Sequence, residues 1–174
     1  MHPYLANVVD SCLPGNISVG MREKATGRLV GVMLNVIITP ETDDVIQLGD
    51  YPTEKCRLYR EMMEQLCLGT NVLRDFGKKK QFEFFLLTTH PDYSGKGLGK
   101  ELIRVSEGIC KENGCDVASI QASNPITEII VSKMGFKVIK SFDVTSFKSK
   151  EGKQILDGTN MNGTTHFTYL IKEY

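Results

Sequence analysis

The sequence predicts one domain of mixed α/β (α+β) class, in which helices flank a mostly antiparallel sheet. The 174 residues suit a single domain of ordinary size, so we treat 1–174 as one unit. An aliphatic hairpin near the N-terminus supplies antiparallel strands. A unit of strand, glycine bend, helix and strand follows at 81–122. Its first strand is apolar on both faces, which places it near the middle of the sheet.

Composition excludes several classes of protein. Apolar residues make up 41% and charged residues 24%, which is globular composition. Lys plus Arg and Asp plus Glu both number 21, so the formal net charge is zero. Nonspecific electrostatic binding to nucleic acid or to a membrane surface is therefore not expected. No apolar run approaches the roughly 20 residues of a spanning helix, and the N-terminus does not resemble a secretory signal. We expect a cytoplasmic protein with neither a nucleic-acid nor a membrane partner.

Cysteine usage agrees with that expectation. The five cysteines are an odd number and form no CxxC pair. Neither a disulfide framework nor a zinc ribbon is therefore predicted, and we expect no metal site.

The first half of the chain predicts a hairpin and a long helix. Segments 17–25 and 29–38 are the two hairpin strands, with Thr26-Gly27 as the turn. A polar loop runs from Thr39 to about Pro52. Thr53 then caps a helix that Gly77 ends, and its apolar residues share one face. We interpret that face as core rather than as a binding pocket; its members are Cys56, Tyr59, Met62, Met63, Leu66, Cys67 and Leu73.

The second half predicts four strands and two helices. Gln81–Thr89 is the strongest strand signal, because it holds three Phe, two Leu and two Thr without a breaker. The other predicted elements are a helix at 100–113 ended by Gly114, a strand at 117–122, a short helix between Asn124 and Gly135, and strands at 136–147 and 164–171.

The glycine bend Ser94-Gly95-Lys96-Gly97-Leu98-Gly99 carries the chemistry. Amides at a helix N-terminus lack internal partners and attract anions, and glycines let a phosphate approach the backbone. Two nucleotide motifs do not fit. A Walker A loop would need one more residue and a hydroxyl where Glu101 stands. A dinucleotide fold needs GxGxxG and an acidic residue after the next strand, whereas Asp116 precedes that strand.

The bend resembles motif A of the GNAT superfamily of acyl-CoA-dependent N-acetyltransferases, which is Arg or Gln, two residues, Gly, one residue, then Gly or Ala. Gly97 and Gly99 match, and Ser94 departs from the pattern. A second match is Asn124 leading to Met134-Gly135-Phe136, and the resemblance covers about residues 17 to 174. Within the superfamily the chain looks most like insect arylalkylamine (dopamine-type) N-acetyltransferases. This narrower resemblance is based on segment 31–35, the long middle helix, the bend and segment 170–173.

The resemblance implies acetyl-CoA as cosubstrate and a sheet splayed between its two central parallel strands. The acetyl group would pass to a primary amine, such as the arylalkylamines dopamine, tyramine and serotonin. Backbone groups of Leu86, Leu87 and Thr88 would hold the pantetheine arm, with Asn124 on the far side and Lys133 near the adenosine phosphate. The pyrophosphate would lie on the bend, whose residues are Ser94, Gly95, Lys96, Gly97, Leu98, Gly99 and Lys100.

Hydroxyl groups are the first candidates for catalytic roles. Many family members protonate the thiolate with a Tyr at the position where this chain has Val131. The insect group places hydroxyls near the helix after the fifth strand, where Ser123 and Thr127 stand. Helix capping explains the same two residues equally well.

A base or water chain must deprotonate the amine, whose pKa lies near the lysine value of about 10. The insect group's base belongs to a first strand–helix unit that this chain lacks by the same comparison. His90 is the first substitute, ahead of Glu83 and His166.

Because the first strand–helix unit is missing, we predict that the amine site is compromised while the acyl-CoA site is intact.

We expect a monomer or weak dimer. The alternatives are a non-catalytic acyl-CoA-binding module, or a transferase that acts on a polyamine or a protein lysine.

Overall fold

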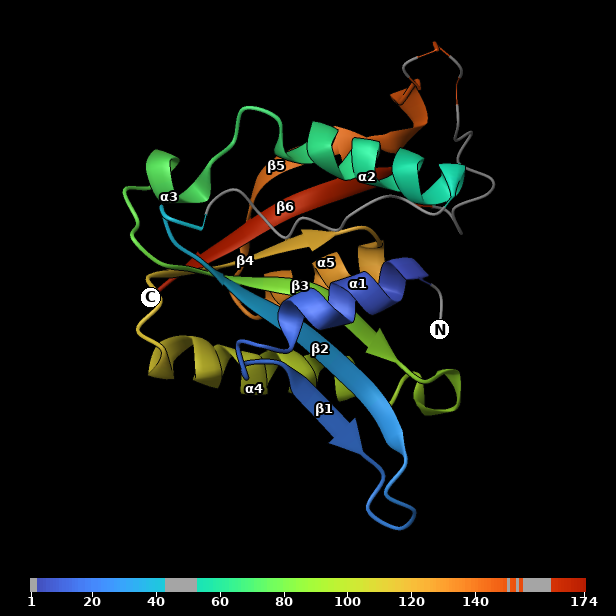
Figure 1. Ribbon diagram of the computed structural model, residues 1–174, viewed down its shortest axis with the longest axis vertical. Helices are drawn as coiled ribbons and strands as arrows, with labels where there is room; N and C mark the ends of the chain where they lie inside the picture. Colours follow the sequence, from blue (N-terminus) through green and yellow to red (C-terminus); the bar gives the residue numbers. More distant parts are fainter. Residues whose placement is uncertain (1–2, 43–52, 150, 153, 155–163) are drawn as a thin grey trace. The chain divides into compact units, whose positions relative to one another are not determined.

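The computed structural model describes residues 3–42, 53–149, 151–152, 154 and 164–174 (Figure 1). Most of the predicted polar loop, from residue 43 to 52, lies outside the described residues. The strands are β1 (Val19–Arg22), β2 (Leu29–Ile38), β3 (Gln81–Thr89), β4 (Val117–Ala122), β5 (Lys137–Asp143) and β6 (His166–Glu173). The helices are α1 (Pro3–Cys12), α2 (Glu54–Cys67), α3 (Val72–Asp75), α4 (Leu98–Glu112) and α5 (Pro125–Lys133), with 3-10 turns η1 (Pro91–Tyr93) and η2 (Val144–Ser146).

The six strands form one open sheet in the order β1-β2-β3-β4-β6-β5. The pairs β1/β2, β2/β3 and β5/β6 are antiparallel. The sheet is mostly antiparallel and contains two parallel strands, which confirms the predicted fold class. The splay between the parallel strands stays a prediction.

The chain divides into two compact units, and the boundary falls inside β4. The first unit comprises residues 1–48, 72–119 and 173–174, and the second comprises 49–71 and 120–172. That all residues form a single domain stays a prediction.

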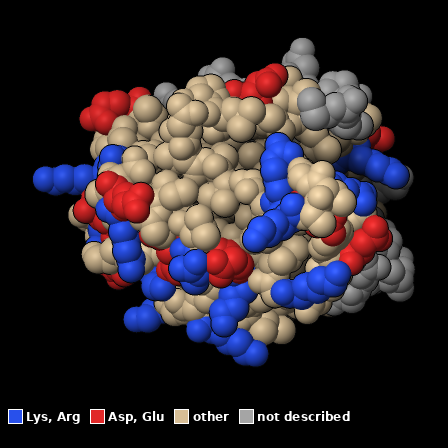
Figure 2. All heavy atoms as spheres, turned by 90° about the horizontal axis from the view of Figure 1, so that it is seen from below, with Lys and Arg blue, Asp and Glu red and all other residues tan. Residues whose placement is uncertain are grey.

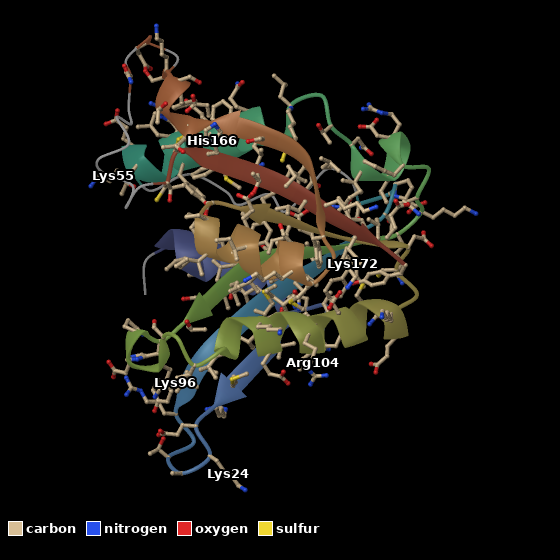
Figure 3. All side chains as sticks on the ribbon, turned by 180° about the vertical axis from the view of Figure 1, so that it is seen from behind. Lys24, Lys55, Lys96, Arg104, His166 and Lys172 are labelled. Atoms are coloured by element: carbon tan, nitrogen blue, oxygen red, sulfur yellow. The ribbon has the colours of Figure 1, made fainter. Side chains whose placement is uncertain are left out.

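In the first unit, α1 and α4 cover opposite faces of β2 and β3 (Figures 1 and 3). Phe82 and Phe84 are buried and meet edge to face at 5.6 Å between ring centroids. Asn35 is also fully buried, and its Nδ2 donates to Ile17 O at 2.8 Å and to Ser106 Oγ at 3.0 Å. These bonds join β2 to α4 and to the segment before β1.

In the second unit, α2 packs on β5. Thr53 caps α2 as predicted, because its Oγ1 accepts a hydrogen bond from Cys56 N at 3.3 Å. Tyr59 meets Phe167 edge to face at 6.2 Å. The buried residues of α2 are Leu58, Met62 and Leu66, and only Met62 and Leu66 belong to the predicted core face. Tyr59 of that face is 37% exposed.

Several predicted boundaries are wrong: β1 is Val19–Arg22 rather than 17–25, α4 is Leu98–Glu112 rather than 100–113, and β6 is His166–Glu173 rather than 164–171. The long helix ends at Cys67, because Gly69 adopts φ +77°, and Leu73 belongs to the separate helix α3. The predicted strand 136–147 ends at Asp143, whose carboxylate caps η2 by accepting from Thr145 N at 2.9 Å. The hairpin is also not the first element, since α1 precedes it.

The surface charges and the character of the helices match what the composition indicates. Lys and Arg side chains are interspersed with Asp and Glu on the face in Figure 2, so neither sign dominates it. Within the described residues, no helix combines the length and apolar character needed to cross a membrane.

Candidate functional site

A one-residue bulge interrupts β3 where the predicted pantetheine segment begins. Leu34 lies opposite Leu86, but the next residue, Asn35, lies opposite Phe84. Phe85 is therefore the extra residue on β3. Because a bulge increases the local twist and redirects backbone groups, it changes how Leu86, Leu87 and Thr88 present theirs. Leu86 and Leu87 are half-buried and Thr88 is exposed.

The glycine bend forms an open cradle of backbone amides. Gly97 is the N-cap residue of α4 with φ +77°, and Gly95 has φ +74°. Both conformations favour glycine. No side chain caps α4, and a Cβ built on either glycine meets no atom within 4 Å. The first amides of α4 are thus accessible to an anion, as the predicted pyrophosphate site requires.

Gly99 brings the first turn of α4 close to β3. A Cβ built on Gly99 would lie 3.7 Å from Leu87 Cδ2, which is an ordinary van der Waals contact. The two predicted cofactor-binding segments of the first unit are therefore neighbours. The contact also explains why the motif accepts either Gly or Ala at this position.

Charges around the cradle favour an anion. Lys96 lies at the bend, with its Nζ 4.6 Å from the Tyr93 ring centroid (Figure 3). Lys100 is exposed in the first turn of α4. The carboxylate of Glu101 in that turn pairs with Arg104 at 2.6 Å, and this bond lowers its pKa. Arg104 thereby offsets the negative charge of Glu101 near the amides.

Two side chains of the β1–β2 hairpin hold η1, which leads into the bend. Tyr93 Oη donates to Glu23 Oε1 at 2.5 Å. Hydrogen bonds from Thr26 and then Tyr93 keep the pKa of Glu23 below its ordinary value. Arg28 contacts His90 at 2.7 Å. Arg28 and Glu23 precede their partners by 62 and 70 positions, so a distant part of the chain fixes the start of the cradle.

A donor lies near each ring nitrogen of His90, and the neutral ring can accept from only one of them. Nε2 is 2.7 Å from Arg28 Nη2, and Nδ1 caps η1 by accepting from Asp92 N at 3.3 Å. These contacts are those of a positioning residue and do not favour His90 as a base. The proposed catalytic role stays a prediction.

Glu83 is a buried carboxylate on the central strand. Its side chain accepts a hydrogen bond of 3.2 Å from Gln81 Nε2, which also donates to Ser119 Oγ at 2.8 Å. Burial and then the charge of Glu83 raise the pKa of Cys12 to about 11, so Cys12 stays a thiol at neutral pH. Glu83 therefore faces α1 within the first unit.

In the second unit, Ser123, Asn124 and Thr127 lie at the start of α5. Asn124 Oδ1 accepts from Thr127 N at 2.9 Å, so the predicted cap is confirmed. The Nδ2 group remains to donate to a ligand. Lys133 is exposed at the other end of the helix. Val131 is fully buried and carries no proton to donate.

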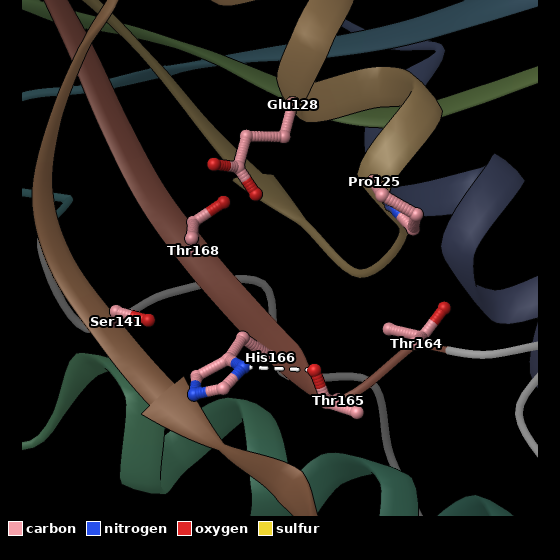
Figure 4. Close-up of a pocket in the computed structure, with 7 residues that line it drawn as sticks. All are labelled: Pro125, Glu128, Ser141, Thr164, Thr165, His166 and Thr168. Atoms are coloured by element: carbon pink, nitrogen blue, oxygen red, sulfur yellow. Dashed lines mark hydrogen bonds between the residues drawn. The ribbon is translucent and has the colours of Figure 1, made fainter. Parts of the chain in front are cut away.

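A polar pocket of about 300 Å³ opens beside the same end of α5 (Figure 4). Glu128 is half-buried on α5, and Thr168 on β6 is 4% exposed. His166 Nδ1 lies 2.9 Å from Thr165 Oγ1. The lining residues are Pro125, Glu128, Ser141, Thr164, Thr165, His166 and Thr168.

Sequence reasoning singled out only His166 from this pocket. Glu128 follows Asn124 by four residues and so lies one helical turn away, which is a signal that spacing could have supplied. Nothing in the sequence indicated Thr168.

Comparison with known proteins identifies the family. The sequence model described as the acetyltransferase (GNAT) family matches residues 24–136, which is more than half of the chain. No curated protein sequence matches the chain.

Solved structures agree with that match. The chain is similar to arylalkylamine N-acetyltransferase 2 from Aedes aegypti, with 25% identity and a TM-score of 0.85 over 99% of this chain and 80% of that one. It also resembles a Drosophila melanogaster polyamine N acetyltransferase, with 16% identity and a TM-score of 0.76 over 94% and 78% of the two chains. At that lower identity the likeness shows the fold alone. These findings confirm the predicted resemblance, and the chain belongs to the acetyltransferase (GNAT) family.

Proposed function

We propose that this protein transfers an acetyl group from acetyl-CoA to the primary amine of a small molecule. The cradle at Gly95 and Gly97 carries the proposal, because its αL glycines and uncapped helix amides leave open room for a diphosphate.

The proposed backbone contacts to the diphosphate and to the pantetheine arm both lie in the first unit. In this proposal the amides of the bend hold the diphosphate, and the backbone after the Phe85 bulge holds the pantetheine arm. Asn124 Nδ2 donates to the arm from α5, and Lys133 lies near the adenosine phosphate. Acetyl-CoA supplies the acetyl group as a thioester.

The acceptor amine needs its proton removed before it can attack. Glu83 is a buried carboxylate on the strand proposed to hold the arm, so it takes this proton directly or through water. A backbone N–H near Leu87 stabilises the developing oxyanion. Ser123 and Thr127 are the proposed proton donors to the departing sulfur, since both are half-buried at the start of α5.

Two classes of acceptor are supported by different observations. The likeness to the Aedes aegypti arylalkylamine enzyme favours arylalkylamines such as tyramine, dopamine and serotonin. The polar lining of the pocket favours an aliphatic polyamine.

Calorimetry with acetyl-CoA, beside a turnover assay with tyramine, dopamine and agmatine, tests the proposal. We expect acetyl-CoA binding together with release of free CoA thiol that depends on an added amine. Binding without turnover on any amine would instead support a non-catalytic acyl-CoA-binding module. No binding would refute the cofactor site itself.

The remaining proposals concern the protein as a whole. We propose a cytoplasmic monomer or weak dimer that binds neither nucleic acid nor membrane. Light scattering across a range of protein concentrations measures the oligomeric state.

A further inference from the structure

The pocket of the second unit contains a buried hydroxyl with no hydrogen-bond partner. Thr168 Oγ1 is inaccessible to solvent and is unpaired within the described part of the chain. Buried polar groups in native structures are almost always paired, so an exception calls for an explanation. Because Thr168 lines the pocket, a ligand can pair with this oxygen once the side chains that shield it from solvent move aside.

The pocket is rich in hydrogen-bond acceptors and bears negative charge. Glu128 contributes a carboxylate that makes no ion pair with any described residue. Figure 4 shows this carboxylate and the Thr168 hydroxyl directed toward the same space. Ser141 and Thr164 add further hydroxyls, and neither Lys nor Arg is among the lining residues that the structure describes. Such a set complements an ammonium or guanidinium, which offers only donors.

The lining also bears on the shape of the ligand. None of the seven described lining residues is Phe, Tyr or Trp. The described lining therefore offers no aromatic side chain to the ring of an arylalkylamine. A chain of methylene groups that ends in a cation satisfies both the charge and the unpaired hydroxyl.

The pocket adjoins the proposed cofactor site through α5. Glu128 N donates to Asn124 O at 3.3 Å, so the carboxylate lies one turn beyond the residue proposed to hold the pantetheine arm. An acceptor that places one amine at the thioester would extend past this turn.

We propose that Glu128 and Thr168 bind the distal cation of the acceptor, so that the preferred acceptor is an aliphatic amine with two positively charged ends. The inference rests on the proposed function and names its substrate class. Glu128 and Thr168 are specificity-determining residues in this proposal, and neither takes part in the acyl transfer.

The test compares agmatine with tyramine in the wild-type protein and in Glu128→Gln, Thr168→Val and Glu112→Gln. Glu112→Gln is the control, because it removes an exposed carboxylate from α4. We expect the wild type to favour agmatine in kcat/KM. In Glu128→Gln, KM for agmatine should rise at least about tenfold, with kcat and the tyramine KM nearly unchanged. Thr168→Val should give a smaller rise.

A second measurement separates this inference from the proposed function. Calorimetry of agmatine alone should show binding that Glu128→Gln weakens and Glu112→Gln preserves, whether or not acetyl-CoA binds. Equal agmatine affinity in the wild type and Glu128→Gln, or a preference for tyramine, would overturn the inference while leaving acetyl transfer intact. If the wild-type protein does not bind acetyl-CoA, the proposed function is refuted but the cation site is not.

Discussion

Tyr93 and Glu23 join the entrance of the glycine bend to the loop of the β1–β2 hairpin through a hydrogen bond of 2.5 Å. Tyr93 is the last residue of η1, directly before Ser94, and Glu23 follows directly after β1. The backbone of Glu23 is itself fixed, because Glu23 N donates to Arg28 O and Gly27 N donates to Glu23 O, both at 2.8 Å. The bend is thus anchored from outside its own motif.

Tyr93→Phe should weaken acetyl-CoA binding by about 3- to 10-fold, because the bend loses its anchor while its amides remain. Calorimetry with acetyl-CoA measures the change. Tyr174→Phe is a matched control, since Tyr174 Oη donates to Glu107 Oε1 at 2.8 Å near the far end of α4. Equal losses of affinity in both variants would show that helix stability, rather than the bend, controls the site.

Gly97→Ala should lower the affinity for acetyl-CoA more than it lowers stability. The αL backbone makes alanine costly by about 1 kcal/mol, and the new methyl group enters the open space above the amides. Gly114→Ala carries the same kind of strain at the opposite end of α4, with φ +63° and open surroundings. Thermal melting should show similar losses for the two variants, and only Gly97→Ala should change the dissociation constant. If Gly97→Ala binds acetyl-CoA normally, the cradle is not the diphosphate site.

Asn124→Asp separates helix capping from ligand binding. Aspartate caps as well as asparagine, so α5 should keep its stability. The substitution replaces the Nδ2 donor with a negatively charged oxygen, and we expect the dissociation constant of acetyl-CoA to rise about tenfold. Thr53→Ala, which removes only the cap of α2, should cost about 1 kcal/mol of stability and leave acetyl-CoA binding unchanged. Unaltered binding in Asn124→Asp would leave Asn124 with the capping role alone.

Local signals predicted the elements that depend on short stretches of sequence. Strand β3 has the predicted bounds, because nine consecutive residues of high strand propensity leave no competing structure. The caps at Thr53 and Asn124 were also predicted, since a cap needs only the residue and the amides that follow it. The bend was found for the same reason.

Features that need a distant partner escaped prediction. Helix α1 is short, and of its apolar residues at helical spacing (Leu5, Val8, Val9 and Cys12) only Val8 and Cys12 are buried, both 1% exposed, against strands that come later in the sequence. The bulge at Phe85 exists only relative to the register of β2. The unpaired hydroxyl of Thr168 is likewise a property of the packed structure rather than of its segment.

Asp116→Asn should remove a pH-dependent part of the stability. Backbone amides of Lys79 and Lys80 donate to Asp116 Oδ2 at 2.9 and 3.1 Å and lower the pKa of its carboxyl. Because the folded pKa lies below the unfolded value, the stabilisation is present above an unfolded pKa of about 3.9 and is lost as pH falls through the folded pKa. The difference in free energy of unfolding between wild type and Asp116→Asn should therefore be largest near neutral pH and shrink in acid. Urea titrations at a series of pH values measure it, and a constant difference would contradict the assignment.

His90→Gln should leave catalysis nearly intact, with kcat within about threefold of the wild type. Arg28 and the amide of Asp92 each lie near a nitrogen of the ring, and glutamine retains an oxygen that can accept from the same amide. A catalytic histidine would behave differently, because its loss typically lowers the rate by about 100- to 10,000-fold. The kcat of this variant, measured beside that of Glu83→Gln, distinguishes the two residues. We expect kcat to stay near the wild-type value in His90→Gln and to fall in Glu83→Gln, and the reverse pattern would restore His90 as the base.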